Sequence, residues 1–411
     1  MRETQYAVWL RDRHVGVLHQ RGDYTRMTFD VSYREDPDRP VLGLHFEETL
    51  LADQASALRL PPWFSNLLPE GRIREWVAED RGVSVDREME LLAHMGHDLP
   101  GAVRVLPADV PIDRTAWEMS ALTGMQSPEV SDWHPGWRIS LAGVQLKFAV
   151  LAKDDRFTVP GYGDGSDWIV KLPDRQFENL PANEHAVMSL ARESGIEVPD
   201  TRLVHRDELD GIPVNVWPSD EEFAYAVKRF DRTATRGLVH IEDLAQVRNF
   251  YPGDKYRGNF ETLASLIYRS HDLESLREFA RRLTFIILVN NGDAHLKNWS
   301  LIYHDPRRPR LAPAYDLVST AVYRVGEGPE DLGLKFGGTK AFERVRFATF
   351  RRLEERLGAV GADLAGEAER TVTRTLAAWE QHADSLGVSR ELRKEIDAAL
   401  SIRASSLAKI H

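Results

Sequence analysis

The chain has 411 residues, 42% hydrophobic and 28% charged, an ordinary balance for a globular protein long enough for two or three domains. It contains no cysteine, which excludes disulfides, thiolate nucleophiles and cysteine-ligated structural zinc. Its net charge of −11 excludes a general electrostatic attraction to nucleic acid or anionic lipid, so any DNA contact requires a local basic patch or a basic partner.

The N-terminus, "MRETQYAVWLRDRH", places charges on both sides of a short apolar stretch, which is unlike a signal peptide. No apolar run along the chain is long enough to cross a bilayer. We therefore expect no membrane association and a cytoplasmic location.

The first hundred residues change from a strand-like to a helix-like pattern. Alternating apolar residues predict strands at 5–18, which holds two strands and a turn, and at 26–33 and 41–46. Apolar residues at helical spacing between prolines and glycines predict helices within 60–82 and 86–96. We predict a β-rich, then helical domain over residues 1–106.

Residues 107–137 hold four prolines and little periodicity, which is typical of a connecting segment. The pattern then predicts the sequence strand, strand, helix and strand, at 138–152, 168–173, 183–195 and 223–232. After Gly237 it is largely helical, apart from residues 290–303 and 311–320. This pattern favours a second domain made of two parts, a β-rich part at 138–236 and a helical part at 237–411.

The stretch "NNGDAHLKNWSLIY", residues 290–303, places Asp293, His295 and Asn298 directly before a predicted buried strand. Asp293 and Asn298 have the spacing of a protein-kinase catalytic loop, in which the Asp accepts a hydroxyl proton and the Asn holds magnesium. An ordinary turn has the same spacing by chance, so the pair alone leaves both readings open.

A second carboxylate, Asp316, follows two predicted strands at 299–304 and 310–314. A hairpin of these strands would return Asp316 to the side of Asn298, and magnesium prefers such oxygen ligands. The alternative is that Asp316 caps a helix beginning at Leu317.

Further parts of a phosphate site lie upstream. "ISLAG" offers a small-residue turn whose backbone N–H groups could cover phosphates, and "WIVKLP" offers Lys171 in an apolar strand. A lysine in that position must reach solvent, a carboxylate or a ligand phosphate. Glu184, early in the next predicted helix, looks like its partner.

These pieces stand in the order of a known family. The motifs "LPPWFSNLLPEG", "GHDLPGAVRV", "ISLAGVQLK", "IVKLP", "NEHAVM", "KRFDR", "EDLAQ", "NNGDAHLKN" and "YDLVST" together resemble HipA-type toxin kinases over nearly the whole chain. The resemblance implies an α+β, two-lobed protein-kinase-like fold with a β-rich N-terminal part and a mostly helical C-terminal lobe. It also implies an ATP- and Mg²⁺-dependent serine/threonine kinase that arrests growth or causes persistence, and a small DNA-binding HipB-like antitoxin that neutralises it.

The resemblance also implies roles for single residues. Asp293 is the expected catalytic base, and Asn298 and Asp316 are the expected magnesium ligands. The expected ATP contacts are Lys171, His295 and Gln246 on the phosphate side, Lys228, Arg229 and Phe230 at the adenine hinge, Asp231 near the ribose, and Ala142 and Gly143 in the phosphate-covering turn. Ser140, in the same turn, matches the family's autophosphorylated serine.

Several alternatives remain at this point. His295 reads equally as a hydrogen-bonded loop residue, and Gln246 as a surface residue of a helix. The Asp–Asn spacing also occurs in small-molecule phosphotransferases of the aminoglycoside type, and a kinase-like fold can serve as a non-enzymatic module that binds an antitoxin. The protein substrate is expected to be a component of translation, such as an aminoacyl-tRNA synthetase.

Overall fold

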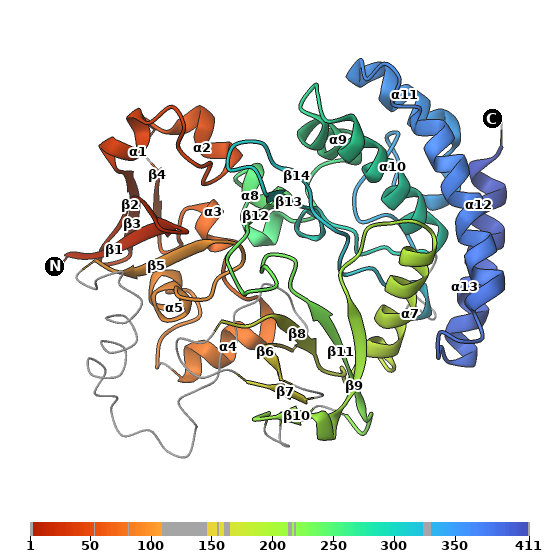
Figure 1. Ribbon diagram of the computed structural model, residues 1–411, viewed down its shortest axis with the longest axis horizontal. Coiled ribbons are helices and arrows are strands. Elements are labelled where there is room, and N and C mark those ends of the chain that lie inside the picture. The colour runs from red at the N-terminus through yellow and green to blue at the C-terminus, as the bar shows by residue number, and fades with distance from the viewer. Residues whose placement is uncertain are drawn as a thin grey trace.

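The computed structural model describes residues 3–52, 54–80, 82–108, 146–153, 156–159, 165–212, 216–217, 219–323 and 330–409. The described strands form sheets of five, six and three strands. In Figure 1 the N-terminal elements lie at one end, the strands between residues 147 and 228 lie below the centre, and the blue C-terminal helices lie at the other end.

The N-terminal domain is built on the five-stranded sheet, in the order β4-β3-β2-β1-β5 with all neighbours antiparallel. Its strands are β1 (Glu3–Leu10), β2 (Arg13–Arg21), β3 (Tyr24–Phe29), β4 (Gln54–Ala57) and β5 (Val103–Pro107). Exposed and buried residues alternate along β3, so this part of the sheet buries one face. The helices of this domain are α1 (Val31–Glu35), α2 (Leu44–Thr49), α3 (Pro62–Ser65), α4 (Gly71–Asp80) and α5 (Glu88–Met95).

The second sheet has the order β10-β7-β6-β8-β11-β9. Its strands are β6 (Lys147–Lys153), β7 (Arg156–Thr158), β8 (Trp168–Lys171), β9 (Thr201–His205), β10 (Leu209–Asp210) and β11 (Phe223–Lys228). Helix α7 (Leu180–Glu193) contacts β9 and β11 of this sheet and α12 of the helical lobe. The antiparallel register of β6 and β8 sets Lys147 directly opposite Lys171.

The C-terminal lobe is mostly helical and contains the three-stranded sheet β12-β13-β14. Its helices are α8 (Leu244–Val247), α9 (Phe260–Tyr268), α10 (Leu273–Leu288), α11 (Phe347–Leu357), α12 (Leu364–His382) and α13 (Arg390–Leu407). The small strands are β12 (His240–Asp243), β13 (Ser300–Tyr303) and β14 (Arg310–Leu311). Short 3₁₀ turns are η1 (Arg206–Glu208), η3 (Pro252–Asp254), η4 (Leu296–Asn298), η5 (Ala321–Tyr323) and η6 (Phe342–Arg344).

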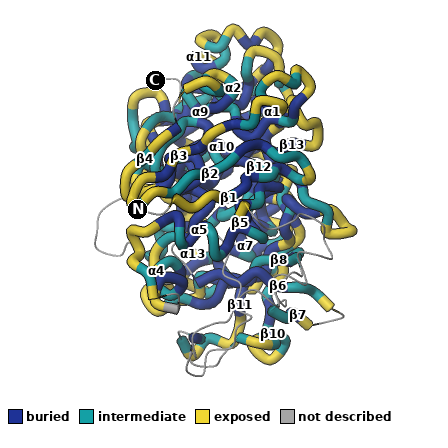
Figure 2. The backbone as a smooth tube through the Cα atoms, turned by 90° about the vertical axis from the view of Figure 1, so that its left-hand side faces the viewer, coloured by how far each residue is buried: buried dark blue, intermediate teal, exposed yellow. Residues whose placement is uncertain are grey.

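Helix α10 is the centre of this lobe and contacts α9, α12 and α13. Its first turn is capped by Asp272, whose carboxylate accepts from the Ser275 N–H at 3.0 Å. Figure 2 shows the buried backbone running through α10 and β12, with exposed residues at the periphery. Of the helices in the described ranges, none combines the length and apolarity required to cross a bilayer.

The fold class predicted from the sequence is confirmed, and the hairpin predicted at 5–18 forms β1 and β2. The strand predicted at 26–33 ends at Phe29, because Asp30 caps α1 by accepting from the Ser32 N–H at 2.8 Å. The strand predicted at 41–46 is wrong, since helix α2 begins at Leu44. The Leu44 N–H donates to the Glu242 carboxylate at 2.9 Å, so a residue 198 positions away satisfies the start of this helix.

Candidate active site

The loop between α10 and β13 holds Asp293 and Asn298 in one hydrogen-bonded turn. The Asp293 carbonyl accepts from the His295 N–H at 2.8 Å and from the Asn298 side-chain amide at 2.9 Å. The Asp293 N–H donates to the Asn291 side chain at 3.0 Å. The loop geometry is therefore set locally, and the Asn298 amide oxygen accepts no hydrogen bond from the part of the chain that the structure describes.

Gly292 is required by close packing at this loop. A Cβ on Gly292 would lie 2.3 Å from a Glu330 carboxylate oxygen and 2.7 Å from the Asp331 carbonyl. The Gly292 N–H donates to the Thr320 hydroxyl at 2.8 Å. The segment before Asp293 is thus fitted against Thr320, Glu330 and Asp331 with no room for a side chain at Gly292.

Asp316 reaches the loop through the predicted hairpin. Strands β13 and β14 pair antiparallel, and the Tyr315 hydroxyl donates to the Lys297 carbonyl at 2.8 Å. Asp316 has a φ of +54°, a left-handed conformation uncommon for a non-glycine residue, and no helix begins at Leu317. The helix-capping alternative is wrong, and Asp316 is held in a strained conformation beside the loop that holds Asp293 and Asn298.

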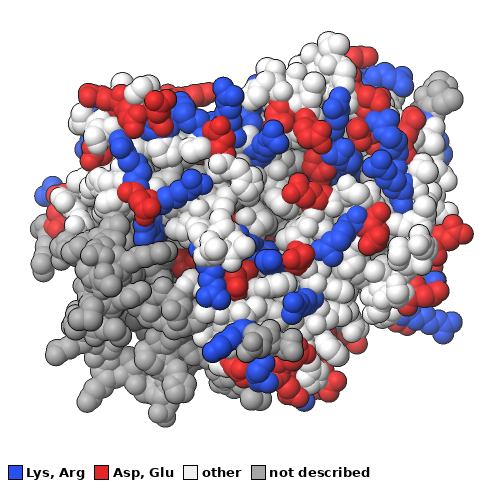
Figure 3. Space-filling view, in the orientation of Figure 1, with Lys and Arg blue, Asp and Glu red and all other residues white. Residues whose placement is uncertain are grey.

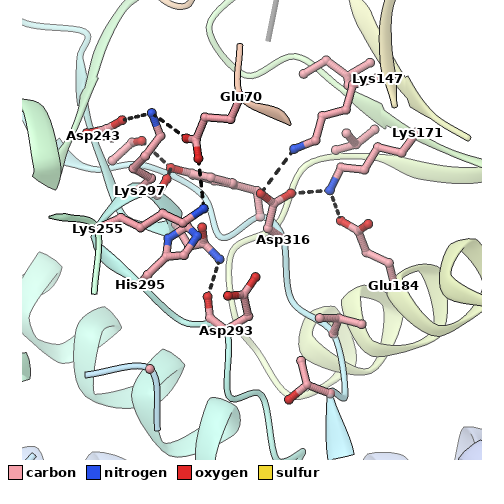
Figure 4. Close-up of a pocket in the computed structure, with 18 of the residues that line it drawn as sticks. Glu70, Lys147, Lys171, Glu184, Asp243, Lys255, Asp293, His295, Lys297 and Asp316 are labelled. Atoms are coloured by element: carbon pink, nitrogen blue, oxygen red, sulfur yellow. Dashed lines mark hydrogen bonds and ion pairs between the residues drawn. The ribbon is translucent and has the colours of Figure 1, made fainter. Parts of the chain in front are cut away.

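Two lysines and two carboxylates form what we call the pocket cluster (Figure 4): Lys147, Lys171, Glu184 and Asp316. The Lys171 ammonium donates to both Glu184 and Asp316, and the Lys147 ammonium lies 3.7 Å from the Asp316 carboxylate. Burial acts against the charge of Asp316, but Lys147 and Lys171 outweigh it and lower the Asp316 pKa. The expected pairing of Lys171 with Glu184 is present.

Lys147 was not singled out in the sequence, although "QLKFAVL" places it in an apolar strand as "WIVKLP" places Lys171. Burial lowers the Lys147 pKa, and the neighbouring Asp316 opposes that shift. Like charges directly opposite on paired strands repel, so Asp316 is the group that allows both ammoniums to stay buried. The missed signal was a second lysine within a buried strand.

A second group of charged side chains lines the cavity on the side of the N-terminal domain, which contributes Glu70. Glu70 lies 3.1 Å from the Lys255 ammonium and 3.3 Å from the Lys297 ammonium, which also lies 3.7 Å from Asp243. Lys297 further donates to the Asn66 carbonyl at 3.2 Å. The loop that holds Asp293 and Asn298 is thus tied to the N-terminal domain through Lys297. No spacing in the sequence indicated this, because the partners come from three distant segments.

His295 and Gln246 are both buried, so the surface reading of Gln246 is wrong. Gln246 closes a capping box at the start of α8 with Asp243, and its amide donates to the Trp63 carbonyl at 3.1 Å. Burial lowers the pKa of His295 to about 4, so its imidazole is neutral near pH 7. The buried Nδ1 of His295 has no hydrogen-bond partner among the described residues, which fits a group that meets a ligand.

The hinge residues divide into an exposed and a buried set. Lys228 is exposed and lies 3.4 Å from Asp200, whereas the Phe230 ring lies 5.6 Å from the Tyr315 ring. Asp231 is buried and accepts from Arg229 at 2.8 Å and from the Gly101 N–H at 2.8 Å. The Asp231 carboxylate expected near the ribose is therefore already hydrogen-bonded within the protein.

All of these predicted residues line one cavity of about 800 Å³. This volume lies in the range of small-molecule and cofactor sites. Ser140, Ala142 and Gly143 lie outside the described residues.

The donor set suits a nucleotide bound with magnesium. Asn298 and Asp316 offer two oxygen ligands, and magnesium in nucleotide sites takes one or two protein oxygens together with phosphate oxygens and water. Within the described residues there is no cluster of three or more His, Asp or Glu side chains that could hold a metal without such a ligand.

Comparison with known proteins agrees with this arrangement. The family models of the HipA N-terminal domain and the HipA-like C-terminal domain match residues 6–106 and 139–383. A protein of Sinorhizobium fredii that bears the name "Putative kinase Y4dM" is 39% identical over 390 residues, covering 91% of this chain and 90% of the relative. The serine/threonine-protein kinase toxin HipA of Shewanella oneidensis is 27% identical over 332 residues, covering 73% of this chain and 72% of that protein.

A solved structure shares the fold along the chain. The complex of Shewanella oneidensis HipA with HipB and operator DNA gives a TM-score of 0.72 at 20% identity, covering 98% of this chain and 96% of that one. With the matched family models and the kinase-like cavity, this establishes that the chain belongs to the HipA family of kinase-like proteins.

Proposed function

We propose that this protein is an ATP- and magnesium-dependent protein kinase that phosphorylates a serine or threonine of a translation component. One observation carries the proposal: Asp293, Asn298, Asp316 and the Lys171–Glu184 pair converge on a single cavity. A kinase mechanism would use these groups in different roles, from Asp293 as the acceptor of the hydroxyl proton to Lys171 as the phosphate-binding lysine. The Ser/Thr kinase name of the Shewanella relative supports the choice of acceptor.

In this mechanism Asp293 takes the proton of the acceptor hydroxyl while the oxygen of that hydroxyl forms a bond to the γ-phosphorus. The bond from that phosphorus to the β–γ bridging oxygen breaks, and ADP leaves. Lys171 and Lys147 attract the nucleotide phosphates, while neutral His295 hydrogen-bonds on the phosphate side. Asn298 and Asp316 would hold magnesium, which when bound neutralises charge on the phosphates.

The test is Asp293→Asn. Losing the base should reduce phosphoryl transfer by at least about a hundredfold while the unfolding free energy and ATP affinity stay close to wild type. Transfer should also stop when EDTA removes magnesium and return when the metal is restored. An Asp293→Asn protein with near wild-type transfer would refute the assignment. Phosphoproteomics after brief induction would identify the substrate, and aminoglycoside phosphorylation would instead favour a small-molecule phosphotransferase.

We also propose that Ser140 is autophosphorylated and that the modification inactivates the enzyme. A phosphate there adds roughly −1.5 to −2 charge and would repel the phosphates of ATP. Mass spectrometry after incubation with ATP and magnesium should find phosphate on Ser140 in the wild type and none in Asp293→Asn. A Ser140→Asp protein that still binds ATP and arrests growth would contradict the switch.

We further propose a cytoplasmic complex with a HipB-like helix-turn-helix antitoxin that contacts DNA on behalf of both proteins. The fold neighbour crystallised with HipB and operator DNA supports this. On the face in Figure 3, Lys and Arg are interspersed with Asp and Glu. With a net charge of −11, the chain alone should show only weak DNA binding at moderate salt. Tight, sequence-specific binding of operator DNA by this chain alone would contradict the proposal.

A further inference from the structure

Tyr256 is bonded to the residue that the proposed mechanism uses as its base. The Tyr256 hydroxyl donates a hydrogen bond to the Asp293 carboxylate. Its ring packs edge-to-face on the His295 ring with centroids 5.1 Å apart. The phenol thus covers the catalytic loop at Asp293 and at His295.

The backbone beside Tyr256 is joined to the same loop. The Leu296 N–H donates to the Lys255 carbonyl at 3.0 Å, and the Lys255 ammonium pairs with Glu70 at 3.1 Å. Tyr256 is 45% exposed. The main chain is therefore anchored, while the ring already borders solvent and can turn away from Asp293.

The phenol remains a hydrogen-bond donor under ordinary conditions. Burial, the charge of Asp293 and the hydrogen bond to Asp293 all raise the Tyr256 pKa above its ordinary value. A protonated phenol on the carboxylate makes the contact that an acceptor hydroxyl must make before it gives up its proton. An acceptor and Tyr256 therefore compete for the same place.

We propose that Tyr256 closes the acceptor side of the active site: its hydroxyl occupies the acceptor position on Asp293, and a protein acceptor must displace it. This rests on the proposed kinase function, with Asp293 as the base. While Tyr256 is in place, water is kept from the base, so ATP is not hydrolysed wastefully. An acceptor segment that packs where the ring lay can move it, and a single water molecule cannot.

The experiment compares Tyr256→Phe with Tyr251→Phe in the full-length protein. Tyr251 is a matched control, because it lies five residues earlier and its hydroxyl is hydrogen-bonded to Ser56 at 2.8 Å instead of to Asp293. Two reactions are measured with magnesium and ATP. One is hydrolysis without acceptor, in which water attacks the γ-phosphorus and yields ADP and phosphate, and the other is transfer to a library of serine- and threonine-containing peptides.

Removing the Tyr256 hydroxyl should raise ATP hydrolysis about tenfold, since a hydrogen bond to a charged group no longer competes with water. The KM for the peptide library should fall while kcat and the KM for ATP stay unchanged. The Tyr251→Phe protein should behave as wild type in both reactions. Asp293→Asn combined with Tyr256→Phe should lose the added hydrolysis.

Other results overturn the inference. If Tyr256→Phe lowers hydrolysis and peptide kcat together and shifts the pH–rate profile, the tyrosine positions the base and does not cover it. If Tyr256→Phe matches wild type while transfer still depends on Asp293, the inference fails and the kinase function stands. If neither reaction depends on Asp293, both fail.

Discussion

Two buried charge clusters in this protein have the same balance of charges, two cations and two carboxylates, but differ in exposure to solvent. The pocket cluster has two lysines and two carboxylates, and the cluster we call the seam cluster has Asp98, Arg229, Asp231 and Arg232. All four seam side chains are 1–7% exposed, whereas the Asp316 carboxylate in the pocket is 29% exposed. The same balance of charges therefore occurs in a cluster that is closed to solvent, the seam cluster, and in one that solvent reaches, the pocket cluster.

The cations explain the difference. The forked guanidinium of Arg232 reaches Asp98 at 2.7 Å, Asp231 at 3.0 Å and the Gly101 carbonyl at 2.9 Å, so it links segments that are distant in the chain. A lysine is a single point charge on a flexible stem and can exchange a carboxylate for a phosphate. The seam cluster therefore joins the N-terminal domain to the kinase-like part of the chain, and we expect the lysines of the pocket cluster to exchange partners if a phosphate ligand binds.

The largest expected effect is at the seam. Asp98→Ala leaves two buried guanidiniums with one carboxylate, which should lower the free energy of unfolding by about 3–5 kcal/mol. Urea denaturation measures this, and Asp12→Ala is the matched control because its carboxylate is 99% exposed beside Arg104. A loss below about 1 kcal/mol in Asp98→Ala would show that the seam is not stabilised by these charges.

A third buried site, at Glu242, sharpens the comparison because its hydrogen-bond donors are neutral. Glu242 accepts from the Trp63 indole at 3.0 Å, from the Leu44 N–H and from the Tyr303 hydroxyl, and burial raises its pKa to about 7. The folded protein then binds a proton at Glu242 that the unfolded chain releases at its ordinary value of 4.5. The contribution of protonated Glu242 to the free energy of unfolding is fully present below pH 4.5. It is lost as pH rises to about 7, and the total loss is roughly 3 kcal/mol.

Glu242→Gln removes this titration and keeps the shape of the side chain. The difference in unfolding free energy between wild type and Glu242→Gln should change steadily from pH 4.5 to 7 and level off above that. Urea titrations at half-unit steps of pH measure it. A constant difference across that range would mean that Glu242 is ionised in the folded protein throughout.

In the pocket, Asp316→Asn should act on ligand binding more than on stability. The magnesium-dependent gain in ATP affinity should fall by at least about tenfold, because an oxygen ligand has lost its charge. Unfolding should be affected less than in Asp98→Ala, since water reaches the site of this carboxylate. Calorimetric titrations with ATP, in the presence and in the absence of magnesium, measure this effect. An equal loss of ATP affinity under both conditions would argue against Asp316 as a metal ligand.

The smallest effect on stability is expected at Lys147. Lys147→Met should weaken ATP binding about tenfold by removing a phosphate-facing charge. The unfolding free energy should stay within about 1 kcal/mol or rise, because the repulsion with Lys171 ends. Lys153→Met is the control, since Lys153 lies at the exposed end of the same strand. An unchanged ATP affinity in Lys147→Met would mean that Lys171, and not Lys147, attracts the ATP phosphates.

Much of the site was predictable because its parts lie in short local motifs. The Asp293–Asn298 spacing is set within one loop, and the β13–β14 hairpin that returns Asp316 spans few residues. The strand wrongly predicted at 41–46 shows the limit of such reasoning. Its alternating pattern lost to a helix whose first N–H is bonded to Glu242 in another domain.

The sequence by itself determined which residues are candidates for the chemistry, because motif order, an apolar strand around Lys171 and the Asp293–Asn298 spacing are local properties. Only the tertiary structure decided which charges meet. Asp316 binds Lys171 across 145 positions, Lys297 donates to Asn66 across 231, and Tyr256 meets Asp293 across 37. Such pairings depend on how sheets and helices pack, and a pattern with a period of two or 3.6 residues does not contain that information.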